Sequence, residues 1–454
     1  MTHTTGRRGT SPLPPRAVDG ARNWMLRTML LGSFLVGAAS ALAEDPPARP
    51  GIDAPELARL GSYAVGFATL TLRQPDQLDP LQGEKTAAPF TRELPLRVWY
   101  PAAHAGTALV YHSALPGPDG KPVAFTIQGI ASADAPAAPG SFPLVLLAHG
   151  GSNTPEVIAW LAENLATKGY VVAAPDFGVP PITERAKFIF PIARRPLDIA
   201  FAVAEIRRRA ARHEAPFGTT DGTAVALVGY SMGGYGVLTA AGASLEGHLA
   251  GATRGALDAY VAGAARAKDV AVSGVSAVVA IAPPRQLGPL EMWAPGGLGN
   301  ISAPTFLIVG SQDPLVGYET GVRVIFEQET RAPRYLLTFR EAGHNIAMSG
   351  APTEMQGRLW DKDWFEDPVW RKPRLMAIEA HFITAFLDKY VKHEAMRGAY
   401  LDGLVPNSND GAWPGGPHPY GSYSPGVPDA TLWKGFQERH VNGMSLEYRP
   451  AAHD

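Results

Sequence analysis

The stretch that decides the fold runs from Ala224 to Gly234 and reads AVALVGYSMGG. Its first half is apolar, as in a buried strand, and Tyr235 to Ala241 continue as the start of a helix. A serine on such a tight strand-to-helix turn has strained backbone angles, and glycines two positions before and after it leave room for neighbouring chain. We therefore expect Ser231 to project above a sheet as a nucleophile. An ordinary Gly-rich turn is the alternative, and the strand-turn-helix context argues against it.

The segments around this turn alternate between strand and helix patterns. Apolar residues at helical spacing mark Pro155 to Lys168 and Leu197 to Arg209. Near-continuous apolar runs suit parallel strands that are buried on both faces. These runs are Phe142 to Ala148, Tyr170 to Ala174, Ala224 to Val228, Ala277 to Ala282 and Thr305 to Val309. Together with antiparallel edge strands expected at Tyr63 to Leu72 and Leu94 to Tyr100, they predict an α/β fold with a mostly parallel doubly wound sheet. Its ligand site is expected at the carboxyl ends of the strands.

A serine hydroxyl needs an oriented base before it can attack a carbonyl. In a fold of this kind the partners follow in the order Ser, acid, His, each on a loop after a strand. Asp313 stands just beyond the run that ends at Val309, within GSQDP, and His344 follows YLLTFREAG. We therefore expect Asp313 to orient His344, and His344 to act as the base. The alternative for Asp313 is a turn residue before Pro314, and the alternative for His344 is a surface-loop histidine.

Other acids and histidines fit these roles less well. His381 falls within an amphipathic helical pattern, His248 in an Ala-rich stretch, and His213 before the nucleophile strand. Glu341 precedes the loop of His344, and Asp176 comes before the serine in the chain.

The tetrahedral intermediate of acyl transfer needs two N–H donors for its oxyanion. One expected donor is the backbone amide of Met232, which follows the nucleophile at a helix N-terminus. The other is expected from His149-Gly150-Gly151-Ser152 after a strand, and we choose Gly151. His149 more often holds such a Gly-rich turn through hydrogen bonds than transfers protons itself.

Several other segments carry structural expectations. Residues Ser113 to Gly140, rich in Pro and Gly, are expected to form a long surface loop with a short strand at Val123 to Ile127. The Ala-rich stretch 236–270 is a candidate helical cap over the site, and Leu375 to Val391 is expected to be a helix that packs on the sheet. The body is expected to span 44–400. The Gly- and Pro-rich tail, 401–454, is expected to dock on it because five of the nine tryptophans fall in the last hundred or so residues.

Residues 1–43 have the parts of a secretory signal peptide. An apolar run of about fifteen residues, Met29 to Ala43, follows Arg22 and Arg27 and ends in Ala-Leu-Ala. It is shorter than the roughly 20 residues that span a bilayer, so we expect cleavage after Ala43, export, and no stable membrane span afterwards. Met1 or Met25 is the start of translation.

The composition excludes several chemistries. The 454 residues contain no cysteine, which excludes disulfides, thiolate metal sites, a thiol nucleophile and lipid attachment through cysteine. A formal charge of -2 with no evident basic patch disfavours nucleic-acid binding. Five of the 40 basic and one of the 42 acidic residues lie in the first 43, so the remaining chain has a net charge of -6.

AHGGSN, GYSMGGYG, GSQDPLV and EAGHN, in this order, resemble the serine-nucleophile α/β-hydrolase superfamily. Within it the chain resembles bacterial predicted dienelactone hydrolases, which are similar to platelet-activating-factor acetylhydrolases. The closer likeness rests on LPLRVWYPA, FPLVLLAHGG, RRPLDI and HFITAFLDKY and covers roughly residues 58 to 395. It implies an α/β-hydrolase fold, with Ser231, Asp313 and His344 as triad and Gly151 with Met232 as oxyanion donors. Genuine dienelactone hydrolases use a cysteine nucleophile, so the name describes ancestry better than substrate.

These patterns predict a secreted or periplasmic carboxylic-ester hydrolase that forms an acyl-enzyme and needs no metal or organic cofactor. Its substrate is expected to be a small-molecule or lipid-like ester, with the substrate-binding residues and oligomeric state left open. A serine peptidase or amidase with the same triad and an inactive binding protein on a hydrolase scaffold are the alternatives.

Overall fold

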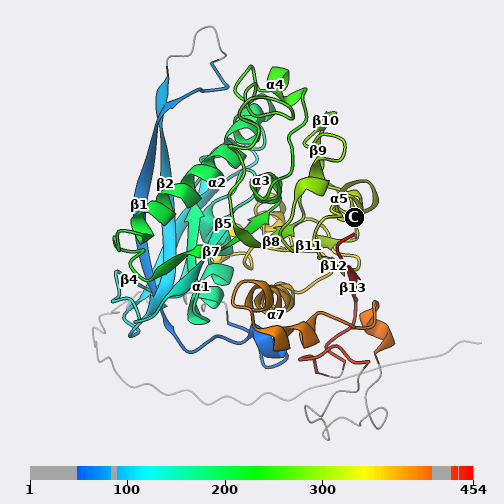
Figure 1. Cartoon of the computed structure of the whole chain (residues 1–454). Helices are drawn as coiled ribbons and strands as arrows, with labels where there is room; N and C mark the ends of the chain where they lie inside the picture. The colour runs from blue at the N-terminus through cyan, green and yellow to red at the C-terminus, as the bar shows by residue number, and fades with distance from the viewer. Residues whose placement is uncertain (1–48, 83–88, 412–430, 438, 453–454) are drawn as a thin grey trace, which may run out of the picture. The chain divides into compact units, whose positions relative to one another are not determined.

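A central sheet with helices on both faces organises the chain (Figure 1). The computed structural model describes residues 49–82, 89–411, 431–437 and 439–452. The expected signal peptide and its cleavage site at Ala43 lie outside the described residues. The described residues belong to one compact unit, Glu44–Asp454.

Eleven strands of the described residues form the main sheet, in the order β13-β12-β11-β8-β7-β5-β6-β2-β1-β4-β3. They are β1 Ala64–Gln77, β2 Phe90–Ala102, β3 Ala108–Pro116, β4 Pro122–Ala133, β5 Phe142–Ala148, β6 Val171–Pro175, β7 Thr220–Tyr230, β8 Val275–Ile281, β11 Thr305–Gly310, β12 Arg334–Phe339 and β13 Met444–Arg449. Two short strands, β9 Gln286–Leu287 and β10 Leu290–Glu291, pair separately.

The centre of the main sheet is parallel. β5 pairs in parallel with β6 and β7, and β7, β8, β11 and β12 continue in parallel. β2 joins β1 and β6 in antiparallel pairs. The order β1-β2-β6-β5-β7-β8-β11-β12, with β2 reversed, is that of an α/β-hydrolase sheet. The fold expected from the sequence is therefore confirmed.

The helices lie on both faces of this sheet. They are α1 Ala159–Thr167, α2 Ile189–Ala210, α3 Met232–Ala240, α4 Leu249–Ala252, α5 Arg323–Gln328, α6 Leu359–Asp363 and α7 Lys372–Tyr390. The central strands bury alternate side chains in two cores. In β5, Val145 and Leu147 pack with α1 and α7, whereas Leu144 and Leu146 pack with α2 and α3. Both faces of the parallel strands are thus buried from solvent, which explains their continuous apolar runs.

The structure corrects the expected loop at 113–140. Its Pro- and Gly-rich sequence instead contains most of a hairpin, in which β3 and β4 pair antiparallel from Ala108↔Ser132 to Pro116↔Pro122. The tight turn between them is closed by the N–H of Gly117, which donates to the carbonyl of Lys121 at 2.7 Å. Prolines at both strand ends are compatible with pairing because they stand next to the turn.

The expected cap at 236–270 also differs from the structure. Residues 236–240 belong to α3, and only the four residues of α4 are helical in the rest of the stretch. The stretch leads away from the C-terminal end of α3 towards the start of β8, and the N–H of Val272 donates to the carbonyl of Ala240. The part of the stretch that follows α3 is therefore mostly turns, and the expected helical cap is not formed there.

The described parts of the C-terminal tail pack on the body. β13 pairs antiparallel with β12 and ends the sheet. Trp433 is 1% exposed, contacts the ring of Phe382 on α7, and donates from Nε1 to the carbonyl of Val405 at 2.8 Å.

Candidate active site

Ser231 occupies a strained turn at the carboxyl end of β7. Its φ and ψ are 52° and -120°, in the left-handed region that side chains rarely adopt. A Cβ on Gly229 would lie 2.3 Å from the carbonyl oxygen of Gly233, and one on Gly233 would lie 2.1 Å from that of Ala148. Only glycine therefore fits at these two positions, which is what the sequence pattern predicted.

Three side chains distant in the sequence form a hydrogen-bonded line at this turn. Nε2 of His344 lies 3.0 Å from Oγ of Ser231, and Nδ1 of His344 lies 2.7 Å from Oδ2 of Asp313. His344 is 8% exposed and Asp313 is 5% exposed, whereas Ser231 is half-buried. The three residues chosen from the sequence are thus within hydrogen-bonding distance of one another.

Asp313 is oriented by its own loop. Its Oδ1 accepts the backbone N–H groups of Leu315 and Val316 at 2.9 and 3.0 Å, which leaves Oδ2 for His344. Burial opposes the charged form, but His344 and these two N–H groups outweigh it and hold the pKa of Asp313 below its ordinary value. Asp313 therefore stays ionised near neutral pH.

The loop that carries His344 is anchored on both sides. Tyr230 donates from its hydroxyl to the carbonyl of His344 at 3.2 Å, and its ring centroid lies 5.4 Å from that of His344. The N–H of Gly343 donates to Asp367 at 2.7 Å, and Nζ of Lys372 donates to the carbonyl of Asn345. These contacts fix the backbone that positions the imidazole.

The two expected oxyanion donors come from adjacent segments. A Cβ on Gly151 would lie 3.9 Å from Cβ of Met232, so the loop after β5 passes beside the nucleophile turn. Met232 is the first residue of α3, where a backbone N–H has no partner within the helix. In the described part of the chain, no backbone or side-chain acceptor pairs with the N–H of Gly151. Both N–H groups are therefore free to bind an oxyanion.

His149 holds this loop through hydrogen bonds. The N–H of Phe177 donates to Nε2 of His149 at 3.2 Å, so Nε2 is unprotonated and Nδ1 donates to the carbonyl of Gly150 at 2.9 Å. Burial, followed by the charge of Arg195, lowers the pKa of His149 well below its ordinary value. A buried imidazole whose pKa is lowered and whose two nitrogens are both engaged is unsuited to proton transfer.

The other histidines and acids considered from the sequence are placed elsewhere. His381 is fully buried in α7, accepts the N–H of Leu57 at 3.1 Å, and has its pKa lowered by burial to about 3. His213 and His248 are at least partly exposed, and neither contacts Ser231 or Asp313 among the hydrogen bonds of the described residues. Asp176 pairs with Arg97 at 3.6 Å.

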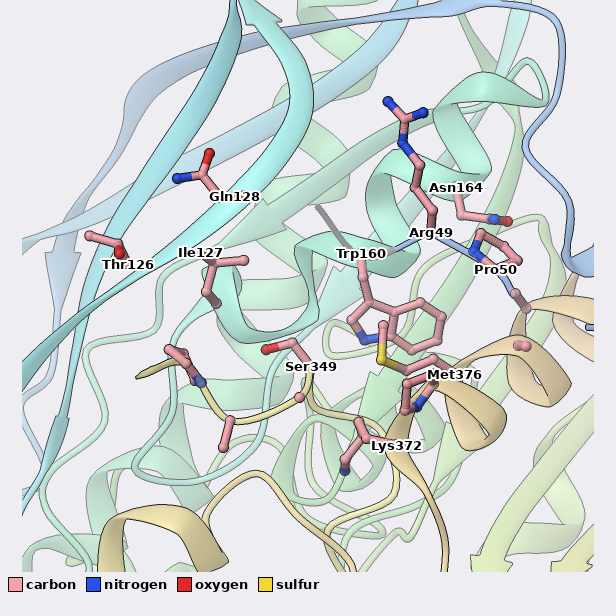
Figure 2. Close-up of a pocket in the computed structure, with 16 residues that line it drawn as sticks. Arg49, Pro50, Thr126, Ile127, Gln128, Trp160, Asn164, Ser349, Lys372 and Met376 are labelled. Carbon is pink, nitrogen blue, oxygen red and sulfur yellow. The ribbon is translucent and has the colours of Figure 1, made fainter. Parts of the chain in front are cut away.

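A cavity of about 320 Å³ lies between α1, α7 and β4, and residues 349–352 also line it (Figure 2). Its lining includes Trp160, Ser349, Lys372 and Met376. Trp160 donates from Nε1 to the carbonyl of Ala347 at 2.9 Å, which connects the cavity wall to the loop of His344. None of the triad residues lines this cavity, so it is separate from the Ser231 site.

Two further features concern metals and membranes. Within the described residues, no group of three or more His, Asp or Glu side chains is arranged to hold a metal ion. The helices among those same residues are too short or too polar to cross a bilayer.

The sequence patterns did not reveal the residues that anchor the site. Tyr230, Asp367 and Lys372 contact the loop of His344, and Arg195 contacts the loop of Gly151. Arg195 stands in RRPLDI, which carried the closer resemblance, and a charged pair beside an apolar helical pattern was the available signal.

The chain was compared with family models, curated sequences and solved structures. No protein-family model matches the chain, and no curated protein sequence matches it. Among solved structures, the chain is similar to a ferulic acid esterase from Streptomyces cinnamoneus, with 18% sequence identity, coverage of 75% of this chain and 94% of that chain, and a TM-score of 0.49. The closer resemblance to predicted dienelactone hydrolases and platelet-activating-factor acetylhydrolases stays a prediction.

Proposed function

We propose that this protein is a serine hydrolase of carboxylic esters. The observation that carries the proposal is the hydrogen-bonded line from Ser231 through His344 to Asp313, set on a strained strand-to-helix turn. Such a line is the arrangement by which a weak hydroxyl nucleophile becomes reactive. Ser231 is the nucleophile, His344 the base, and Asp313 the acid that orients it.

The first half of the reaction forms an acyl-enzyme. Nε2 of His344 accepts the proton of Ser231 as Oγ attacks the ester carbonyl carbon, and the carbonyl oxygen becomes an oxyanion. The N–H groups of Gly151 and Met232 donate to this oxyanion. As the tetrahedral intermediate collapses, the carbon–oxygen bond to the alcohol breaks, and His344 passes its proton to the departing alkoxide.

The second half releases the acid. A water molecule gives a proton to His344 and attacks the acyl carbon, and a second oxyanion forms in the same place. Its collapse breaks the bond to Oγ, and His344 returns the proton to Ser231. Asp313 stays ionised throughout and stabilises the imidazolium, consistent with its lowered pKa. No step needs a metal or a redox cofactor.

We further propose that the enzyme works outside the cytoplasm. The basic residues, short apolar run and Ala-Leu-Ala ending of residues 1–43 support export with cleavage after Ala43. Its substrate would then be an ester encountered in the periplasm or outside the cell. N-terminal sequencing of the exported protein tests this part of the proposal, since an intact Met1 or Met25 would contradict it.

The activity is tested with short-chain p-nitrophenyl esters and a matched ester and amide that share one acyl group. We expect hydrolysis of the esters, strong preference for the ester over the amide, and loss of activity in Ser231→Ala. Full activity in Ser231→Ala would contradict the assignment, and preference for the amide would favour a peptidase or amidase.

A further inference from the structure

Arg195 lies wholly buried beneath the loop that supplies Gly151. It is on α2, 36 residues before the nucleophile in sequence, and Nη1 donates to the carbonyl of His149 at 2.7 Å. Nη2 lies 3.4 Å from the carbonyl of Gly150. We propose that Arg195 is a positioning residue for the oxyanion site, which aims the N–H of Gly151 by holding the carbonyl groups that precede it. The inference rests on the proposed function.

The geometry of the peptide bond connects these contacts to the oxyanion. In a trans peptide the carbonyl of one residue and the N–H of the next point in opposite directions. Arg195 fixes the carbonyl of Gly150, and Nδ1 of His149 donates to the same oxygen at 2.9 Å. The N–H of Gly151 must then point away from Arg195. A rotation of this peptide would turn the N–H away from the oxyanion and leave the nucleophile unchanged.

The surroundings of Arg195 keep its guanidinium in one place. Its centre lies 3.8 Å from the ring centroid of Phe177, close enough for a cation–π contact. Its stem passes over Gly236 of α3, where an added Cβ would lie 2.5 Å from Cγ of Arg195. Burial is the largest influence on Arg195 and lowers its pKa to about 9, so the group is charged at neutral pH.

The rest of RRPLDI supports this arrangement. Asp198 is fully buried. Its Oδ1 accepts a hydrogen bond from Arg194 at 2.7 Å, and its Oδ2 accepts one from Arg92 at 2.9 Å. The charge of Asp198 also favours the charged form of Arg195. Asp198 therefore holds α2 to β2 through Arg92 and stabilises a buried cation, whereas Arg194 holds α2 to β1 through Gln74 and Gln77. Of the residues of RRPLDI, only Arg195 reaches the loop of Gly151.

Arg207 offers a matched control on the same helix. It donates from Nε to the carbonyl of Gly222 at 2.7 Å and from Nη1 to that of Ser273 at 2.9 Å. It thus also holds two backbone carbonyl groups, but one of them lies near the start of β7, at the opposite end of that strand from the nucleophile turn. A general effect of losing such an arginine should appear in Arg207→Met as well as in Arg195→Met.

The experiment compares wild type, Arg195→Met and Arg207→Met with a p-nitrophenyl ester and a trifluoromethyl ketone of the same acyl chain. The ketone forms an oxyanion adduct with the serine, whereas the ester binds as a neutral carbonyl compound. Acylation and deacylation both pass through an oxyanion, so a weaker oxyanion site slows both steps and leaves their ratio, and with it KM, nearly unchanged. In Arg195→Met we expect kcat to fall about 10- to 100-fold, with a parallel rise in the ketone inhibition constant. KM should change less than about twofold, and Arg207→Met should keep all three constants near wild type.

Gly236→Ala is the second variant, and it tests the positioning role of Arg195 if Arg195→Met fails to fold. It displaces the Arg195 stem without removing the guanidinium, so it should lower kcat and ketone affinity together, by less than Arg195→Met. The role of Arg195 is overturned if Arg195→Met has the same kcat and ketone inhibition constant as Arg207→Met. It is also overturned if kcat falls in Arg195→Met or Gly236→Ala without a loss of ketone affinity. A wild-type protein that neither hydrolyses the ester nor binds the ketone would instead contradict the proposed function.

Discussion

Replacing Asp313 by asparagine tests whether its carboxylate does more than hold His344 in place. Oδ1 of Asp313 accepts two backbone N–H groups, from Leu315 and Val316. An asparagine must keep its oxygen toward these donors, because an amide nitrogen cannot accept them. Its NH₂ then faces Nδ1 of His344, which must accept the hydrogen bond and carry its own proton on Nε2. In that tautomer His344 cannot take the proton of Ser231.

The expected loss is large although the substitution is small. A wrongly protonated imidazole in a serine triad lowers kcat by about 10⁴-fold, which corresponds to about 5.5 kcal/mol of transition-state stabilisation. We expect this loss in kcat for a short-chain p-nitrophenyl ester near neutral pH. Thermal unfolding should change little, because the asparagine oxygen still accepts the two N–H groups of its loop.

Asp313→Ala is the control for this prediction. Alanine removes the anchor but leaves His344 free to adopt either tautomer, whereas asparagine holds the unproductive one. We therefore expect Asp313→Asn to be no more active than Asp313→Ala. The expected loss in Asp313→Asn is about 10⁴-fold, so a variant that keeps more than about a tenth of wild-type kcat would refute the tautomer argument. A kcat clearly above that of Asp313→Ala would refute it as well.

Two further predictions concern stability. Gly233→Ala should lower the free energy of unfolding by at least about 2 kcal/mol, since its Cβ would lie 2.1 Å from the carbonyl oxygen of Ala148. Urea unfolding measures this, and Gly247→Ala, with nothing within 4 Å of the added Cβ, should stay close to wild type; equal losses would contradict the argument. Burial raises the pKa of Glu329 from 4.5 to about 8, so the folded protein keeps a proton there that the unfolded chain releases. Stability should therefore fall as pH rises from 4.5 to 8, by up to about 1.4 kcal/mol per pH unit from this group. Glu329→Gln should remove that fall. The thermal unfolding midpoints of wild type and Glu329→Gln are compared at both ends of this pH range, and a difference between the two proteins that is the same at both ends would refute the prediction.

The sequence predicts the centre of this fold better than its margins. The runs ending at Ala148 and Val309 are strands because both faces of the central sheet are buried, which leaves an unmistakable apolar pattern. The hairpin of β3 and β4 was missed because Pro, Gly and Asp cluster in its turn at 117–120 and directly after β4 at 134–140, which is the composition of a loop. Most of the stretch 236–270 is not helical although it is rich in alanine. Gly242, Gly255 and Gly263 have positive φ there and break any continuous helix.

A similar division holds at the candidate active site. Ser231, Asp313 and His344 stand after strands whose carboxyl ends meet at one edge, so local pattern and chain order suffice to place them. Arg195 and Asp367 act on neighbouring loops through contacts between segments distant in sequence. Their positions depend on how α2 and the segment before α7 pack, and no short-range pattern encodes that packing.

The residue that becomes covalently modified tests the central claim most directly. Wild-type protein is treated with a fluorophosphonate, and the intact mass and the modified peptide are determined by mass spectrometry. We predict one adduct per chain, located on Ser231, with no adduct in Ser231→Ala and strongly slowed labelling in His344→Ala. Unmodified wild-type protein, or an adduct on any other residue, would contradict the account.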